Sequence, residues 1–84
     1  MPTLILYTKP ECGLCDEAHS VIERVRADVP FDLRVVDITD DAQLAERYGQ
    51  RVPVVLVDGE EAYVYEVDER DLTGRIEAAA GAAG

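Results

Sequence analysis

The chain has 84 residues, of which 48% are hydrophobic, and a formal net charge of −10 from 18 acidic and 8 basic side chains. This length predicts one small domain over residues 1–84 with a single core. Such an acidic surface repels phosphate groups, so we exclude nucleic acid as a partner. No basic leader followed by an apolar stretch is visible, and no apolar run has membrane-spanning length. We therefore expect a cytoplasmic protein with no membrane partner.

The first part of the chain predicts a strand, a helix and a second strand. Residues 3–7 are apolar and partly β-branched, which favours a buried strand. From Gly13 to Val25 the apolar residues recur at helical spacing, and Pro30 closes this helix. Residues 31–38 alternate and then run apolar, which is typical of a second strand.

The middle of the chain predicts a short helix and a third strand. Thr39 or Asp40 can cap a helix that ends near Tyr48. Residues 52–57 are strongly strand-like apart from Pro53.

The C-terminal part predicts a hairpin and a last helix. Asp58-Gly59 is the strongest hairpin signal in the chain, and residues 62–67 form the returning strand. Asp68 or Asp71 opens the last helix. The low-complexity segment 78–84 is expected to be a frayed tail.

The element order is therefore β-α-β-α-β-β-α, which places the chain in the α/β class. A strand–helix–strand crossover implies that the first two strands are parallel, and the hairpin adds an antiparallel pair. Helices on both faces of the sheet would bury the apolar runs. We predict a four-stranded mixed sheet flanked by three helices.

The only two cysteines, Cys12 and Cys15, lie where the first strand gives way to the first helix. A thiol at a helix N-terminus faces unpaired backbone N–H groups and the positive end of the helix dipole, and both favour the thiolate. The thiolate is the nucleophile in disulfide exchange and also a metal ligand. A disulfide between residues this close would restrain the unfolded chain very little. The pair therefore favours a catalytic or metal-binding role over a structural one.

Three features together resemble the glutaredoxins of the thioredoxin superfamily, and most of all the short bacterial glutaredoxin-like proteins. These features are Cys12-Gly13-Leu14-Cys15 after the first strand, Val52-Pro53 at the third strand, and the element order. The resemblance implies a thioredoxin fold and a thiol–disulfide oxidoreductase. Cys12 would attack a substrate disulfide, and Cys15 would resolve the mixed disulfide.

The same resemblance implies the cofactor and the partners. The redox group would be the Cys12–Cys15 disulfide, with no organic cofactor. The substrate would be a protein disulfide or a low-molecular-weight disulfide, and an external thiol reductant would regenerate the dithiol. We expect a monomer.

The resemblance also suggests substrate-binding residues around the cysteines. Lys9 occupies the place of the glutaredoxin loop lysine, where a cation can stabilise the Cys12 thiolate and meet a substrate carboxylate. Val52-Pro53 matches the family's cis-proline turn, which frees the preceding backbone to pair with a substrate; a trans proline opening an edge strand is the alternative. Arg51 either pairs with an anionic substrate group or is a solvated loop charge.

One segment departs from the family pattern. Glutaredoxins have a Gly-Gly turn after the last strand, which opens a helix N-terminus onto a glutathione carboxylate. Here residues 65–71 contain no glycine pair, and three of the last four are acidic. These carboxylates would repel an anionic tripeptide. Glutathione use is therefore an open question, although glutathione is retained as a candidate substrate.

Two other functions are compatible with the sequence. Cys12, Cys15 and His19 fall near one flank of the helix and could hold zinc or an iron–sulfur cluster, with a fourth ligand from a carboxylate or a second chain. The domain could instead be a non-enzymatic thioredoxin-fold module that binds proteins.

Overall fold

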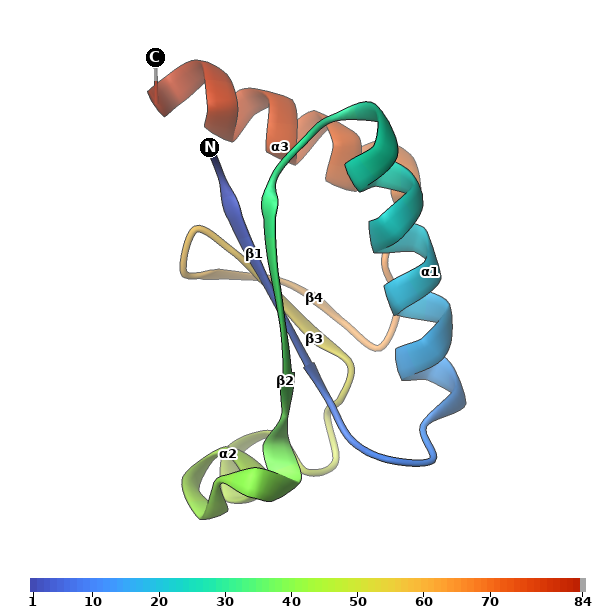
Figure 1. The fold of residues 1–84 in the computed structure, drawn as a ribbon. Coiled ribbons are helices and arrows are strands. Elements are labelled where there is room, and N and C mark those ends of the chain that lie inside the picture. Colours follow the sequence, from blue (N-terminus) through green and yellow to red (C-terminus); the bar gives the residue numbers. More distant parts are fainter. Residues whose placement is uncertain (84) are drawn as a thin grey trace.

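The computed structural model describes residues 1–83, and it has the predicted mixed four-stranded sheet flanked by three helices (Figure 1). A short 3₁₀ turn, η1, is added to the predicted element order. The elements are β1 (Thr3–Thr8), α1 (Gly13–Asp28), β2 (Asp32–Asp37), η1 (Ile38–Asp40), α2 (Ala42–Tyr48), β3 (Val54–Val57), β4 (Glu60–Val64) and α3 (Glu69–Ala83).

The sheet has the strand order β2-β1-β3-β4, with β1 and β3 at its centre. β1 and β2 are parallel, because α1 carries the chain back between them, and the other two pairs are antiparallel. Asp58 and Gly59 join β3 to β4 with φ values of 49° and 87°. Positive φ at both positions is what a two-residue type I′ hairpin turn requires.

α1 and α3 pack on one face of the sheet. Side chains alternate along β1, so Leu4 and Leu6 point to this face, and both are at most 1% exposed. The other buried side chains of this core come from α1, α3 and the neighbouring segments: Ala18, Ile22, Val25, Phe31, Val55, Leu72 and Ile76. This cluster is the main core, and it fixes the direction of α1.

A second cluster covers the opposite face at the end of the sheet near α2. Tyr7 and Val54 are register partners there, and the Tyr48 ring from α2 stacks on Tyr7 with a centroid distance of 4.7 Å. Ile38 and Cys15 belong to the same buried cluster. The start of α1 is therefore packed against the α2 end of the sheet, where the candidate site lies.

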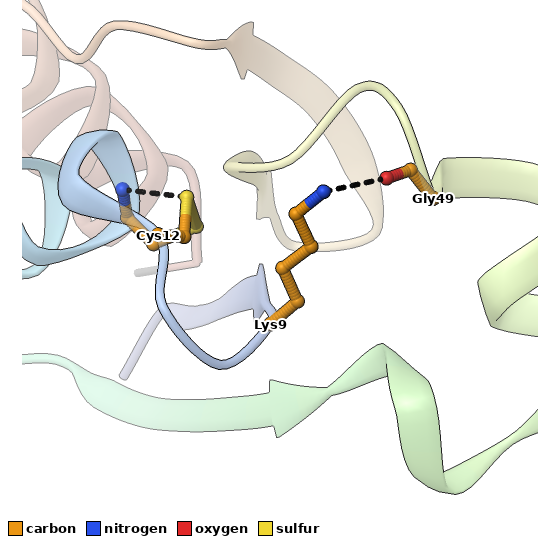
Figure 2. Close-up of a disulfide and its surroundings, with 4 residues drawn as sticks. Lys9, Cys12 and Gly49 are labelled. Atoms are coloured by element: carbon orange, nitrogen blue, oxygen red, sulfur yellow. Dashed lines mark hydrogen bonds between the residues drawn. A yellow bond between two sulfur atoms is a disulfide. The ribbon is translucent and has the colours of Figure 1, made fainter.

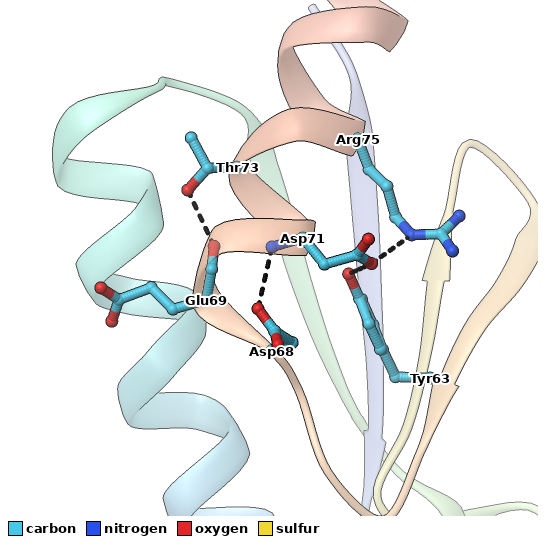
Figure 3. A network of polar contacts seen from close by, with 6 residues as sticks. All are labelled: Tyr63, Asp68, Glu69, Asp71, Thr73 and Arg75. Atoms are coloured by element: carbon cyan, nitrogen blue, oxygen red, sulfur yellow. Dashed lines mark hydrogen bonds and ion pairs between the residues drawn. The ribbon is translucent and has the colours of Figure 1, made fainter.

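A polar network ties α3 to β4 (Figure 3). The Tyr63 hydroxyl donates to Asp71, and the Arg75 Nε lies 2.8 Å from the same carboxylate. The hydrogen bonds from Tyr63 and Arg75 hold the pKa of Asp71 below its ordinary value of 3.8. Burial and the neighbouring carboxylate raise the pKa of Tyr63, so the phenol stays protonated as a donor.

The predicted boundaries need correction in the middle of the chain. α2 is capped by Asp41, whose carboxylate accepts the N–H groups of Gln43 and Leu44, because η1 occupies the positions of the two expected caps. β3 begins at Val54, two residues later than predicted. β4 covers 60–64 rather than 62–67, because Tyr65 has a φ of 73° and cannot continue a strand.

Helix α3 begins as predicted but extends further than expected at its C-terminal end. Of the two candidate caps, Asp68 accepts the N–H of Asp71 at 2.9 Å. At the other end the helix continues to Ala83, where the sequence predicts a frayed tail from residue 78. The alanines of this segment have the highest intrinsic helix propensity, which explains its continuation. Residue 84 lies outside the described residues.

Among residues 1–83, no helix combines the length and the apolar character needed to cross a membrane.

Candidate active site

Cys12 is the N-cap of α1. Its backbone is extended (φ −114°, ψ 105°), and its Sγ accepts the backbone N–H of Cys15 at 3.2 Å (Figure 2). The Cys12 carbonyl also accepts the N–H of Asp16 at 3.2 Å. The sulfur thus takes the place that a Ser or Asp oxygen takes at most helix starts. A negative charge on this sulfur is stabilised by the N–H group and by the helix dipole.

The backbone turns sharply just before this cap. Glu11 has a φ of 57°, a left-handed conformation that is uncommon outside glycine. The turn brings the chain from the end of β1 into the first turn of α1. No propensity at Glu11 predicts this conformation.

Cys12 and Cys15 lie close enough for a disulfide, with their Cα atoms 5.2 Å apart (Figure 2). Their exposures differ: Cys15 is 3% exposed, whereas Cys12 is only partly buried. Cys12 is therefore the more accessible residue of the pair. This difference fits an attacking thiol with a resolving thiol beneath it.

Val52 and Pro53 lie beside the cysteines. The Val52–Pro53 peptide bond is cis. Val52 is 6% exposed and shares a buried cluster with Cys15, and Cys12 packs against that cluster. Because β3 begins at Val54, Val52 lies just outside the sheet.

The Lys9 side chain extends away from the cysteines, toward α2 (Figure 2). Its Nζ donates to the carbonyl oxygen of Gly49 at 3.2 Å. Gly49 is the C-cap of α2, where the negative end of a helix dipole favours a cation. In this structure the lysine therefore joins the loop between β1 and α1 to α2.

Arg51 is engaged within the chain as well. Its guanidinium forms an ion pair with Glu61 of β4, and it lies over the Tyr48 ring at 5.9 Å from the centroid. Both side chains of the ion pair remain about 40% exposed, at 43% and 39%. The arginine is thus neither a free solvated charge nor an unpaired anion-binding group.

Tyr65 is a site residue that the sequence analysis missed. It stands at the turn after β4 with a φ of 73°, its N–H donates to Pro53 O at 2.8 Å, and its hydroxyl donates to Gln50 O at 3.1 Å. These two bonds attach the turn to Gln50 and Pro53, the residues on either side of Arg51 and Val52 in the sequence. No pattern in the sequence signals a tyrosine in this conformation.

His19 does not join the cysteines. Its Nε2 lies 3.4 Å from Glu23 Oε1, one turn further along α1. Within residues 1–83, no three or more His, Cys, Asp or Glu side chains are grouped so that they could hold a metal ion. Within these residues, His19 is therefore not brought together with the cysteines, as the alternative metal site would require.

Comparison with known proteins places the chain among relatives of similar size. The family described as "Glutaredoxin-like domain (DUF836)" matches residues 3–77. An uncharacterised Mycobacterium tuberculosis protein, Rv0508, is 31% identical over 80 residues, which cover 89% of this chain and 82% of that protein.

Solved structures show the same fold. The structural genomics target XcR50 from X. campestris is 34% identical with a TM-score of 0.74, and the match covers 89% of this chain and 96% of that chain. A variant thioredoxin from Halobacterium salinarum is 27% identical with a TM-score of 0.68, over 92% and 73% of the two chains. With its family match, its thioredoxin-like neighbours and its paired cysteines at a helix start, the chain belongs to the glutaredoxin-like family of the thioredoxin superfamily.

Proposed function

We propose that this protein is a thiol–disulfide oxidoreductase that uses Cys12 as nucleophile and Cys15 as resolving thiol. One observation carries the proposal: partly exposed Cys12 caps α1 with its sulfur, which accepts the N–H of Cys15, while Cys15 itself is buried. The cap favours the thiolate at the position that a substrate can reach.

The reaction proceeds in two exchanges. The Cys12 thiolate bonds to one sulfur of the substrate disulfide, whose S–S bond breaks, and the other substrate sulfur leaves as a thiolate and takes a proton from water. Cys15 then loses its proton to solvent and attacks Cys12 Sγ. The Cys12–Cys15 bond forms and the second substrate thiolate leaves and is protonated. Two electrons and two protons pass from the dithiol to the substrate.

The proposal needs no organic cofactor. An external thiol reductant returns two electrons to the Cys12–Cys15 disulfide, and the substrate is a protein disulfide or a low-molecular-weight disulfide. We propose that the protein works as a monomer in a reducing cytoplasm, where such a pair is kept available as a dithiol.

We propose that Val52 and Pro53 contact the substrate, because Val52 belongs to the buried cluster against which Cys12 packs. Lys9 and Arg51 contribute from the α2 side of the site. Each of these two cations already has a partner in the chain, Gly49 O or Glu61, so each must exchange that partner to meet an anionic group.

Trapping of the mixed disulfide tests the assignment of the two sulfurs. A reduced Cys15→Ser variant, mixed with a disulfide-bonded peptide, should accumulate a covalent adduct whose mass equals the protein plus one half of the substrate. A Cys12→Ser variant serves as the matched control and should form no adduct. Adduct on Cys15 alone would reverse the two roles, and adduct on neither variant would refute the proposal.

A further inference from the structure

A groove of about 690 Å³ borders the candidate active site. One wall is the outer side of α1, from Leu14 in the first turn to Arg24 near the last. The other wall is formed by the end of β4 and the segment that leads to α3, from Tyr63 to Asp68. Leu14 lies in the first turn of α1, and Tyr65 donates its N–H to Pro53 O, next to Val52 of the cluster against which Cys12 packs. This end of the groove therefore lies on the side of the molecule that carries the cysteines.

The length of the groove suits a short peptide. Leu14 and Arg24 are ten positions apart in α1, which corresponds to about 15 Å at the usual helical rise. An extended chain advances about 3.3 Å per residue, so this length accommodates about four or five residues. A segment bonded to Cys12 through its own cysteine could therefore place its neighbouring residues along the groove.

Exposed apolar side chains lie in the groove near the cysteines. Leu14 is 44% exposed and Tyr65 is 47% exposed, and both line it. Large apolar side chains gathered at one exposed place are typical of a binding surface. Tyr65 is held there in a left-handed backbone conformation by its bonds to Pro53 O and Gln50 O. Conformations of this kind cost free energy and cluster at functional sites.

The charge of the groove is negative. Glu17, Glu66 and Asp68 line it, and Arg24 is its one cation among the described residues. The Nε of Arg24 lies 2.7 Å from Glu69 Oε1, so this guanidinium already has a carboxylate partner. A basic side chain would find complementary charge here, and an anionic tripeptide such as glutathione would be repelled.

We propose that this groove binds an extended segment of a protein disulfide substrate, with an apolar residue and basic residues close to the reactive cysteine. The inference rests on the proposed oxidoreductase function and adds the substrate class. The apolar residue packs on Leu14 and Tyr65, and the basic residues lie against Glu17 and Glu66. The chain thereby selects basic protein disulfides over glutathione disulfide.

A peptide competition tests the proposal. Two peptides of equal length each carry one cysteine, disulfide-bonded to 2-mercaptoethanol and flanked by two lysines or by two glutamates. The rate at which each oxidises the reduced protein is divided by its rate with dithiothreitol, which corrects for the intrinsic reactivity of the peptide. At low salt we expect the lysine peptide to be favoured by about tenfold, the lower end of electrostatic steering effects.

Matched variants distinguish the effect of the groove carboxylates on the peptide preference from the effect of the overall net charge. Glu17→Gln/Glu66→Gln should reduce this preference by about threefold or more, as expected when two of the nearest charges are removed. Glu46→Gln/Glu77→Gln changes the net charge equally at two exposed positions outside the groove and should leave the preference unchanged. Circular dichroism checks that both variants are folded.

The outcomes distinguish the two proposals. An equal loss of preference in both variants would assign the effect to overall charge and overturn the groove. A preference for the glutamate peptide or for glutathione disulfide would overturn it too. So would a dimer, detected by sedimentation, that buries the groove and makes the peptide preference depend on protein concentration. If neither peptide oxidises the reduced protein faster than it oxidises dithiothreitol, the oxidoreductase function itself fails, and the groove proposal fails with it.

Discussion

At the scale of single residues, the central feature is the unequal environment of two chemically identical side chains. Cys12 is partly exposed and accepts a backbone N–H, whereas Cys15 is 3% exposed. The sequence predicts the pair and their order, because a strand, two spaced cysteines and an amphipathic helix are all visible in it. It does not predict the left-handed conformations at Glu11 and Tyr65, since neither residue type favours them.

Alkylation of the reduced protein should reveal this inequality. At neutral pH and limiting iodoacetamide, we expect Cys12 to be modified about tenfold faster than Cys15 or more, because thiolate character and access both favour it. Peptide mapping by mass spectrometry measures the two rates. Denatured protein is the control, and there the two rates should converge. Equal rates in the folded protein would contradict the assigned roles.

The Arg51–Glu61 ion pair gives a second prediction at this scale. Glu61→Gln should release Arg51 and raise the rate with glutathione disulfide by a factor of about two to five, since an exposed ion pair contributes up to about 1 kcal/mol. Arg51→Met removes the cation and should show no such gain. Stopped-flow kinetics of both variants and the double variant measures the coupling. An unchanged rate in Glu61→Gln would exclude Arg51 as an anion-binding group.

At the scale of elements, α3 is held to β4 by a network that titrates. The bonds from Tyr63 and Arg75 lower the pKa of Asp71 below 3.8 in the folded state. The unfolded chain therefore binds a proton more readily, so this carboxylate stabilises the fold above pH 3.8. The contribution is lost as the pH falls through the lower folded pKa.

An Asp71→Asn variant should therefore be less stable than the parent at pH 7, with the difference shrinking below pH 3.8. Urea denaturation at several pH values measures it. Glu77→Gln, an exposed carboxylate on the same helix, is the matched control and should show little difference at any pH. A gap between Asp71→Asn and the parent that does not change with pH would show that the network is not the source of the stabilisation.

At the scale of the whole molecule, a small core carries most of the stability. Leu72 is fully buried between α3 and the sheet. Leu72→Ala should cost about 2–5 kcal/mol, a large part of the 5–15 kcal/mol typical of a domain. Val35→Ala at a 46% exposed position of β2 should change the stability by only about 0.5 kcal/mol or less. Guanidinium denaturation measures both, and similar costs would contradict the assigned core.

Much of this architecture can be predicted from sequence, because the apolar periodicity changes visibly between strands and helices. The Asp58-Gly59 turn and the apolar stripe of α1 are examples of strong local signals. Local signals fail where tertiary contacts decide. The shift of the α2 cap to Asp41 follows from η1, and the early end of β4 follows from the bonds that hold Tyr65. The partners of Lys9 and Arg51 also depend on tertiary contacts, because Lys9 meets Gly49 only when α2 packs beside the loop, and Arg51 meets Glu61 only when β4 pairs with β3.

The most direct test of the whole account is a redox titration followed by mass spectrometry. The protein is equilibrated in graded glutathione buffers, quenched with acid and alkylated, so that reduced thiols, the internal disulfide and glutathione adducts are counted separately. We predict a reversible Cys12–Cys15 disulfide with a potential between about −270 and −120 mV, the span of this superfamily. Two thiols that stay reduced across the whole series would contradict the account.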